Sequence, residues 1–317
     1  MKVSVYCLVY NHEKVLHTAL EGFVNQKVNF DYEVIVHDDA STDGSRAIIE
    51  EYARRYPKII RPIYQQENQY SKQVSIFNTF IYPRITGEYI AICEGDDYWC
   101  DPDKLQLQVD FLDAHPDYSA CVHNTCKLNV TNDEKSLMYS RTQDADIGFE
   151  DVILRGAQSF HTSSVMYRRQ YGANRPAFFQ KAKTFGDYPL AIYLALSGKI
   201  RFISRTMSVY RSWGEGSWTQ RNMTQLKKIS LHYQYVADML EEVDRYTHGQ
   251  YHQLLRELVV QNRYTSIEFD EQYGQLRREP YREIFNSKPL KYRIKILLRQ
   301  YLNKPYHLYR KIFRSKK

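Results

Sequence analysis

Short apolar runs alternate with segments of helical periodicity along the first half of the chain, and this alternation limits the fold more than any other feature. Residues 3–10 (VSVYCLVY) and 88–93 (EYIAIC) have the length of buried strands, and two more strands are predicted within 32–56 and 59–66. The segments between them, such as 12–26, place apolar residues at helical spacing. Repeated strand and helix units predict an α/β domain with a mainly parallel sheet flanked by helices.

The second half of the chain changes character near residue 222. Before this point, further strands are predicted within 118–128, 160–169 and 201–211. Beyond it the strand signals disappear, and apolar residues recur at helical spacing. We therefore predict an α/β domain with a helical C-terminal extension, divided into residues 1–222, a helical region 223–286 and a tail 287–317.

The positive charge of the chain is confined to this tail. The formal net charge is +7, yet residues 287–317 hold eleven Lys or Arg and no acidic residue. The first 286 residues therefore carry 33 − 37 = −4. Because the body of the chain is slightly acidic, nucleic-acid binding by that body is not expected, and the tail indicates a local surface contact.

The five cysteines favour a reducing environment. Their number is odd and no C-x-x-C pair occurs, so neither a disulfide framework nor a structural zinc site is indicated. The N-terminal apolar stretch is short and interrupted by polar residues, which is typical of a strand and not of a signal peptide. No run approaches the roughly 20 apolar residues that span a bilayer. We expect a cytoplasmic protein.

Acidic residues follow several of the predicted strands. The first strand is followed by Tyr10, the second by Asp38 and Asp39, and the fourth by the acidic stretch Glu94, Asp96 and Asp97. The carboxyl ends of parallel strands share one edge of a sheet, where ligands bind. Clustered carboxylates repel one another unless a cation joins them, and oxygen ligands suit Mg²⁺ or Mn²⁺. The alternative is an exposed turn with solvated acids.

Four segments together resemble the family 2 glycosyltransferases, inverting enzymes of the GT-A fold. They are SVYCLVYNHEKVLHTALEGFVNQ, IVHDDASTDGS, GEYIAICEGDDYWCDPDKLQLQ, and SSVMYRR followed by FGDYPLAIYLALSG. Their order and spacing match the family over about residues 1–220. Two positions in these segments depart from the family pattern: Ala40 replaces a Gly, and Glu94 replaces an Asp.

The resemblance implies roles for the residues of the acidic edge. Asp39 would recognise the nucleotide base beside Tyr10, Asp96 would contact the ribose or the metal, and Asp97 would ligate the metal on the diphosphate. For Asp39 the alternative is an Asx turn at the strand end. Lys72 is a candidate phosphate contact, with a solvated lysine as the alternative.

The late acidic motif supplies the candidate general base, Asp187. An inverting transfer needs one carboxylate to take the proton of the acceptor hydroxyl, and a capping role at the helix start is the alternative. Trp213 stands where many relatives have a histidine near the metal, so a histidine ligand at that position is excluded. It is a candidate for stacking on a sugar, or an anchor of its loop. His161 and Ser163 are candidates for contact with the donor sugar or the acceptor, and a structural role is the alternative.

The tail has the pattern of a basic amphipathic helix. Lys and Arg surround one apolar face, formed by Leu290, Ile294, Leu297, Leu298 and Tyr301. Such a segment suits an anionic membrane surface, and the alternatives are a solvated helix or one packed on a partner subunit. Membrane contact would place the protein at the inner face of the cell membrane.

These features predict a metal-dependent hexosyltransferase that uses a nucleotide-diphosphate sugar, with a UDP-sugar as the expected donor. The expected acceptor is a saccharide, polyprenyl-linked if the tail binds membrane, in bacterial surface polysaccharide synthesis. A nucleotidyltransferase or a nicotinamide enzyme would need a Gly-rich loop after the first strand, where the sequence has VYNHEKVL. A retired transferase that only binds nucleotide sugar or a partner is the alternative.

Overall fold

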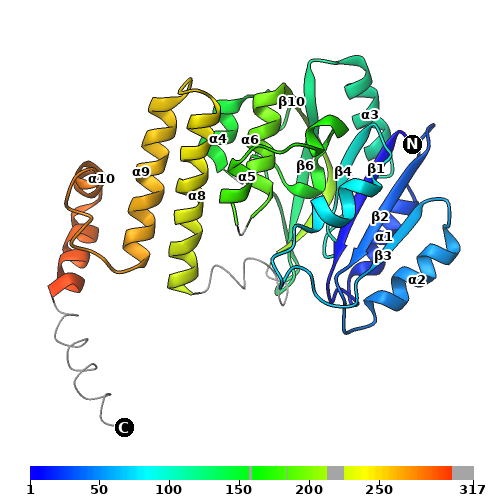
Figure 1. Cartoon of the computed structure of the whole chain (residues 1–317), viewed down its shortest axis with the longest axis horizontal. Helices are drawn as coiled ribbons and strands as arrows, with labels where there is room; N and C mark the ends of the chain where they lie inside the picture. The colour runs from blue at the N-terminus through cyan, green and yellow to red at the C-terminus, as the bar shows by residue number, and fades with distance from the viewer. Residues whose placement is uncertain (157–158, 184, 213–224, 302–317) are drawn as a thin grey trace, which may run out of the picture. The chain divides into compact units, whose positions relative to one another are not determined.

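The computed structural model describes residues 1–156, 159–183, 185–212 and 225–301 (Figure 1). The chain divides into two compact units. The first contains Met1–Arg175 and Asp187–Gly214, and the second contains Pro176–Gly186 and Glu215–Lys317. The second unit thus takes in residues 176–186, which the sequence analysis assigned to the first domain. The predicted boundary at residue 222 lies outside the described residues, and the three-part division stays a prediction.

The first unit is built on one large mixed sheet. Four parallel strands form one half of it, in the order β3-β2-β1-β4: β1 (Val3–Val9), β2 (Tyr32–Asp38), β3 (Ile60–Tyr64) and β4 (Tyr89–Ile92). All four were predicted, and their parallel arrangement confirms the expected α/β fold. Strand order reverses between β1 and β4, which is where open α/β sheets place their ligands.

The other half of the sheet contains strands of both directions. Its members are β5 (Tyr98–Trp99), β6 (Tyr118–Asn129), β7 (Glu134–Leu137), β8 (Ala145–Ile147), β9 (Met166–Arg168) and β10 (Lys199–Ser212). β9 is antiparallel to its neighbours β4 and β6, whereas β10 is parallel to β6. Because β9 runs against β4 and β6, the residues that precede it lie at the edge where the parallel strands end.

Helices cover the sheet, and all of them except α4 lie in segments with helical periodicity. They are α1 (Leu16–Val24), α2 (Ser45–Arg55), α3 (Lys104–Ala114), α4 (Phe149–Arg155) and α6 (Asp187–Ser197). β1 and β2 are buried almost throughout, as expected for strands covered on both faces. The segment 73–85 has helical spacing of its apolar residues but forms only a short and irregular helix. It consists of the π-helix η1 (Phe77–Ile81) and the 3₁₀ turn η2 (Tyr82–Arg84), because Pro83 has no N–H to continue an α-helix.

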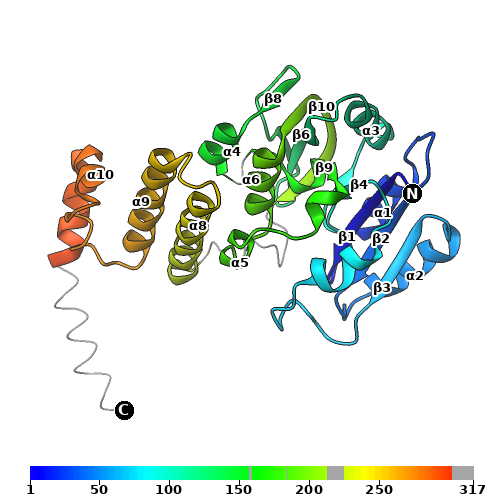
Figure 2. The same ribbon diagram turned by 45° about the horizontal axis from the view of Figure 1, so that its top comes forward.

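The second unit is helical, as predicted. It contains α5 (Phe178–Lys181), α8 (Leu226–Tyr246), α9 (His252–Phe269) and α10 (Arg282–Ser287), and Figures 1 and 2 show α8 and α9 side by side. A small core is formed by Tyr264, Tyr273, Leu276, Phe285 and Ile296. Among the helices of the described ranges, none is both long and apolar enough to cross a membrane.

The turn after β2 contains a residue in an unusual backbone conformation. Ala40 has a φ of 61°, in the left-handed region. For an L-residue with a Cβ this conformation costs about 1–2 kcal/mol, because the Cβ approaches the following carbonyl oxygen. This is the position at which the family resemblance expects Gly. The turn therefore keeps the backbone that suits Gly, although the residue has changed.

We predict that Ala40→Gly raises the free energy of unfolding by about 1 kcal/mol, because relief of the Cβ strain exceeds the added entropy of the unfolded chain. The matched control is Ala47→Gly on the exposed face of α2. This change should lower the stability by roughly 0.5–1 kcal/mol. Urea denaturation measures both, and an Ala40→Gly variant as destabilised as the control would contradict the left-handed turn.

Candidate functional site

The carboxyl ends of β1, β2 and β4 meet at one edge of the sheet. Val9 pairs with Asp38 in the parallel register, and the Asp39 N–H donates to Val9 O at 2.9 Å. The Gly95 N–H donates to Leu8 O at 3.0 Å, which places the acidic stretch after β4 beside the end of β1. The segments that the sequence analysis expected at one edge therefore do gather there.

Hydrogen bonds tie the turn after β1 to the turn after β2. The Asn11 N–H donates to Ser41 Oγ at 3.0 Å, and the Thr42 N–H donates to Asn11 Oδ1 at 2.8 Å. The Glu13 N–H donates to Asp43 Oδ2 at 3.0 Å. The polar segment 41–43 thus fixes the first turn, where Tyr10 is 39% exposed. Contact of Tyr10 with a ligand stays a prediction.

Asp39 is buried and organises the loop after β3. Its Oδ1 accepts from the Gln69 N–H at 2.8 Å, and its Oδ2 accepts from the Tyr70 N–H at 3.0 Å. The alternative for Asp39 was an Asx turn at the end of β2. In the structure it is Asp38 that bonds to this turn, because its Oδ1 accepts from the Ser41 N–H at 3.2 Å. A carboxylate has about four acceptor positions, so Asp39 retains capacity for a base. Base recognition by Asp39 stays a prediction.

Lys72 lies in the loop that Asp39 organises. Its side chain is 49% exposed and forms an ion pair with Glu67 of the same loop. A phosphate would have to compete with this ion pair. The phosphate contact of Lys72 stays a prediction. The alternative, a lysine held only by solvent, does not describe Lys72 fully, because its side chain is paired with Glu67.

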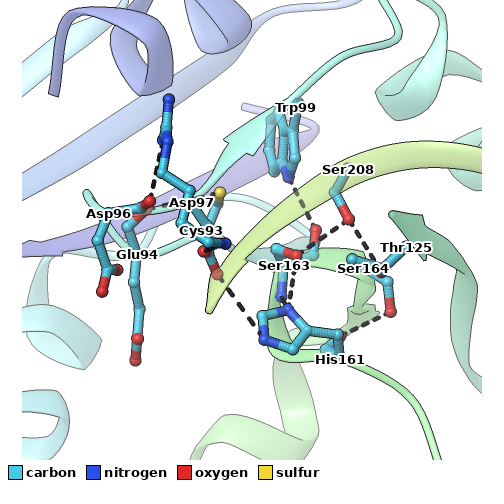
Figure 3. A network of polar contacts seen from close by, with 11 residues as sticks. Cys93, Glu94, Asp96, Asp97, Trp99, Thr125, His161, Ser163, Ser164 and Ser208 are labelled. Carbon is cyan, nitrogen blue, oxygen red and sulfur yellow. Dashed lines mark hydrogen bonds and ion pairs between the residues drawn. The ribbon is translucent and has the colours of Figure 1, made fainter. Parts of the chain in front are cut away.

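Asp97 is the most deeply buried acid of the stretch after β4. It is 2% exposed, its N–H closes a turn on Glu94 O at 3.1 Å, and its Oδ1 accepts from the Arg211 N–H of β10 at 2.9 Å. Burial raises the pKa of this carboxyl well above its usual range, and the charges of Asp96 and Glu94 add to the effect. The second oxygen, Oδ2, lies 3.8 Å from Nε2 of His161 (Figure 3).

Asp96 and Glu94 are oriented differently from Asp97. Asp96 is half-buried and Glu94 is exposed, and Figure 3 shows their carboxylates extending away from the His161 ring. The main-chain oxygen of Asp96 accepts from Arg211 Nη1 at 2.9 Å, and that guanidinium lies 4.5 Å from the centroid of Tyr98. The orientation favours Asp97 over Asp96 as a metal ligand, and both assignments stay predictions.

Trp99 belongs to the core and bonds to the segment that carries His161. It is 3% exposed, its ring meets Phe23 edge-on at 4.9 Å, and its Nε1 donates to Ser163 O at 2.8 Å. The ammonium of the fully buried Lys104 lies 4.0 Å from the ring centroid, and burial lowers the pKa of Lys104 to about 7. Trp99 thus joins the core to the segment before β9.

His161 stands in that segment and reaches the edge because β9 is antiparallel. Its side chain is 14% exposed, its Nδ1 lies 2.8 Å from Ser163 Oγ, and its ring lies 4.5 Å from that of Tyr210. Burial lowers the pKa of His161 to about 4, so the imidazole is neutral at neutral pH. The sequence analysis considered His161 without connecting it to Asp97, because only the direction of β9 connects them.

Asp187 is the first residue of α6. Ser119 Oγ, near the start of β6, donates to Leu194 O, so the C-terminal end of α6 lies at the opposite edge of the sheet and its first turn points toward the site edge. Asp187 Oδ1 accepts from the Tyr188 N–H at 2.8 Å. Burial raises the pKa of Asp187, and the charge of Asp187 contributes to a raised pKa of Tyr139. Its role as a base stays a prediction.

Two predicted features of the site lack structural support. Trp213 lies outside the described residues. Within the described ranges, no group of three or more His, Cys, Asp or Glu side chains is arranged to hold a metal ion. A cation at Asp97 would therefore need ligands from the substrate as well.

Comparison with known families gives one match that covers more than half of the chain. The description "Glycosyl transferase family 2" matches residues 4–175. This range includes the acidic stretch after β4 and the segment that carries His161.

Relatives from bacteria match parts of the chain. An uncharacterised protein of Mycobacterium tuberculosis is 36% identical over 219 residues, which is 68% of this chain and 60% of the relative. The chain therefore spans 60% of the length of that relative. A putative teichuronic acid biosynthesis glycosyltransferase of Bacillus subtilis, TuaG, is 30% identical over 110 residues, which is 35% of this chain and 41% of TuaG.

Solved structures share the fold at low sequence identity. Residues 1–349 of TarS from S. aureus, in complex with UDP-GlcNAc, align with a TM-score of 0.59 and 17% identity over 90% of this chain and 78% of that 1–349 chain. The mannosyltransferase PcManGT from Pyrobaculum calidifontis, in complex with GDP-Man and Mn²⁺, aligns with a TM-score of 0.53 and 16% identity, over 100% of this chain and 88% of PcManGT. These likenesses show the GT-A fold.

Proposed function

Since the chain belongs to glycosyl transferase family 2, we propose that it transfers a sugar from a nucleoside-diphosphate donor to a hydroxyl group of a saccharide acceptor. A UDP-sugar is the proposed donor, because the TarS structure of the same fold holds UDP-GlcNAc. The similarity to TuaG supports a role in bacterial surface polysaccharide synthesis. The proposed reaction inverts the configuration at the anomeric carbon.

One observation carries this proposal: a buried carboxylate, Asp97, lies at the edge where β1, β2 and β4 end. Ligands of open α/β sheets bind at this edge, beside the point where strand order reverses. Folding alone gives no reason to bury Asp97 beside two further acids, because burial and the charges of Asp96 and Glu94 disfavour the charged form of Asp97. A site for a charged ligand does give such a reason.

The residues at this edge fit a divalent cation. Asp97 Oδ2 is a buried oxygen donor. Burial and then the charge of Asp96 raise the pKa of Asp97, and a cation would offset both effects. One or two carboxylates together with substrate phosphates are the usual surroundings of Mg²⁺. Asp97 would hold the cation, with Asp96 as the second candidate. When bound, a divalent cation stabilises the charge that develops on a leaving diphosphate.

Asp187 is the proposed general base. Its Oδ1 is occupied by the Tyr188 N–H, so Oδ2 is the oxygen that would accept the proton of the acceptor hydroxyl. That hydroxyl oxygen then attacks the anomeric carbon from the side opposite the leaving diphosphate. Burial favours this role, because a raised pKa makes the carboxylate a stronger base.

We expect Asp187→Asn to lower the rate of sugar transfer by about 10²–10⁴-fold while donor affinity stays within about threefold. The assay screens UDP- and GDP-sugars with Mn²⁺ for diphosphate release and transfer to lipid-linked saccharides. Asp117→Asn, which removes an exposed carboxylate, is the control. An Asp187→Asn variant with the wild-type rate rejects the base, and a wild type that binds donors without turning any over supports the retired transferase.

The same assay has a predicted pH dependence. The base works deprotonated and its pKa is raised, so kcat/KM should be full at high pH. As pH decreases, kcat/KM should fall with an apparent pKa above the ordinary Asp value of about 3.9.

Excess EDTA should abolish transfer, and added Mn²⁺ should restore it. We expect Asp97→Asn to raise the Mn²⁺ concentration needed for half-maximal UDP binding by at least about tenfold, since it removes the charged ligand. Isothermal titration calorimetry measures this shift. Asp110→Asn on the exposed face of α3 is the control and should leave it unchanged. Undiminished transfer in excess chelator would exclude the cation.

The C-terminal helix supports a membrane contact. Residues 290–301 are helical, and one face exposes a stripe of apolar side chains: Leu290 (63%), Ile294 (47%), Leu298 (52%) and Tyr301 (59%). The opposite face packs inward through Ile296 and Tyr292. Leu297, expected on the exposed face, is half-buried. The stripe is flanked by exposed Lys291, Lys295 and Arg299.

We propose that this stripe binds the anionic lipid surface at the inner face of the cell membrane, where a polyprenyl-linked acceptor would be found. Apolar side chains enter the interface, and each basic residue near anionic lipid adds about 1 kcal/mol. The described residues of this helix include no acid that would oppose the attraction.

Combined substitution of Leu290, Ile294 and Leu298 by Ser should reduce co-sedimentation with phosphatidylglycerol vesicles by at least about tenfold, because it removes most of the buried apolar area. The control replaces the exposed leucines Leu226 and Leu231 of α8 by Ser. Wild-type binding should also be weaker to phosphatidylcholine vesicles and at high salt. Equal binding by the triple variant and the wild type would contradict the membrane contact.

A further inference from the structure

The His161 imidazole lies beside Asp97 and has no role in the reaction proposed above. We propose that His161 Nε2 and Asp97 Oδ2 together ligate the divalent cation, and that this pair selects Mn²⁺ over Mg²⁺. The inference rests on the proposed function only for the presence of a diphosphate ligand. It does not depend on which sugar is transferred or on whether transfer occurs.

The separation of the two atoms fits a shared cation better than a direct bond. Nε2 of His161 and Oδ2 of Asp97 lie 3.8 Å apart, which is too long for a hydrogen bond. Two ligand atoms that are each about 2.1 Å from one cation lie at most about 4.2 Å apart. Figure 3 shows the carboxylate and the edge of the imidazole ring facing each other. Neighbouring ligands of an octahedral ion lie about 3.0 Å apart, so one ion is within reach of both atoms once they approach each other by less than about 1 Å.

The other atoms of both side chains are already held. Asp97 Oδ1 accepts from the Arg211 N–H, which leaves Oδ2 facing His161. His161 Nδ1 lies 2.8 Å from Ser163 Oγ, and Ser163 Oγ donates its own proton to Ser208 Oγ at 3.0 Å. In this arrangement Nδ1–H donates to Ser163 Oγ, and the lone pair of Nε2 points toward Asp97. A metal-bound histidine usually has such a partner on its second ring nitrogen.

A second contact of Nδ1 favours the other tautomer in the absence of a cation. The Ser163 main-chain N–H lies 3.3 Å from Nδ1, which would leave the proton on Nε2. That proton finds no hydrogen bond at 3.8 Å from Asp97. Cation binding requires only that the proton move to Nδ1, where Ser163 Oγ is the closer partner and accepts it. The site thus holds His161 in place in both tautomers.

Buried hydrogen bonds fix the position of the imidazole. Ser208 Oγ continues the chain of hydroxyls to Thr125 Oγ1 at 3.0 Å, Ser164 Oγ donates to His161 O at 2.7 Å, and Trp99 Nε1 donates to Ser163 O (Figure 3). His161 is thus bonded to Ser163 and Ser164 of its own segment, and residues of β5, β6 and β10 hold Ser163 in turn. A rigid support of this kind is typical of metal-binding histidines, whose orientation determines affinity.

The same contacts exclude His161 as a general base. A base needs a ring nitrogen whose lone pair faces the acceptor hydroxyl. Nδ1 is occupied by Ser163, and Nε2 faces Asp97. A role toward the cation is the one that both nitrogens permit.

A nitrogen ligand also determines which cation binds best. Mg²⁺ prefers an all-oxygen environment, whereas imidazole nitrogen strengthens the binding of transition metals. One carboxylate oxygen, one imidazole nitrogen and two diphosphate oxygens therefore favour Mn²⁺. The preference comes from His161 and not from Asp97, so the two contributions are separable by mutation.

The experiment measures Mn²⁺ binding to the full-length chain in the presence of UDP and without any sugar donor. Free Mn²⁺ is counted by electron paramagnetic resonance, and electron spin-echo modulation reports a directly bound imidazole nitrogen. His161→Asn keeps a polar group near Nδ1 and removes Nε2, whereas His161→Gln offers an amide oxygen near Nε2. His115→Asn, at the exposed end of α3, is the control.

We expect His161→Asn to weaken Mn²⁺ binding by about 10–100-fold and Mg²⁺ binding by less than about threefold, with loss of the nitrogen modulation. His161→Gln should recover part of the Mn²⁺ affinity, and His115→Asn should match the wild type. Ser163→Ala keeps Nε2, so it should weaken binding by about tenfold and retain the modulation. This variant decides the question if His161→Asn does not fold.

Wild-type protein that binds Mn²⁺ without nitrogen modulation, or a folded His161→Asn variant with wild-type Mn²⁺ affinity, would overturn the assignment. A wild type that binds no Mn²⁺ in the presence of UDP would overturn it as well. Sugar transfer by a protein without the modulation would leave the proposed function standing and reject this inference. Nitrogen modulation in a protein that transfers sugar to no acceptor would support His161 as a ligand and reject the proposed transferase function.

Discussion

The arrangement of the candidate site depends on how one buried carboxylate is held. Asp97 sits between the backbone N–H of Arg211 on one side and the imidazole of His161 on the other. Both partners are neutral groups at neutral pH, and the neighbouring Asp96 and Glu94 add negative charge. The Arg211 guanidinium offsets part of this negative charge, and further positive charge would stabilise the buried carboxylate. The ligand that supplies it would complete the site.

The sheet explains why these groups meet. β1, β2 and β4 run in one direction and deliver the residues that follow them to the edge, whereas the antiparallel β9 delivers the residues that precede it. β10 brings Arg211 to Asp97 from a position more than one hundred residues later in the chain. Two segments that are distant from Asp97 in sequence, the one before β9 and the end of β10, thus contribute one group each to its surroundings.

Much of this architecture was predictable because its signals are local. Run length and periodicity identified β1 to β4 and the acidic residues that follow them, and the parallel arrangement places those residues together. The link from Asp97 to His161 was not predictable, because β9 has only three residues and its direction depends on β4 and β6. The same holds for Asp39, whose partners in the loop at 69–70 carry no pattern. In the C-terminal helix, the pattern did not show that Ile296 and Tyr292 would pack inward and leave the other apolar face exposed.

The most direct test of this account is a crystal structure of the protein with UDP and Mn²⁺. The account predicts the diphosphate at the carboxyl ends of β1 and β4, with Mn²⁺ bonded directly to Asp97 Oδ2. A nucleotide bound away from this edge, or a Mn²⁺ ion that does not contact Asp97, would contradict it.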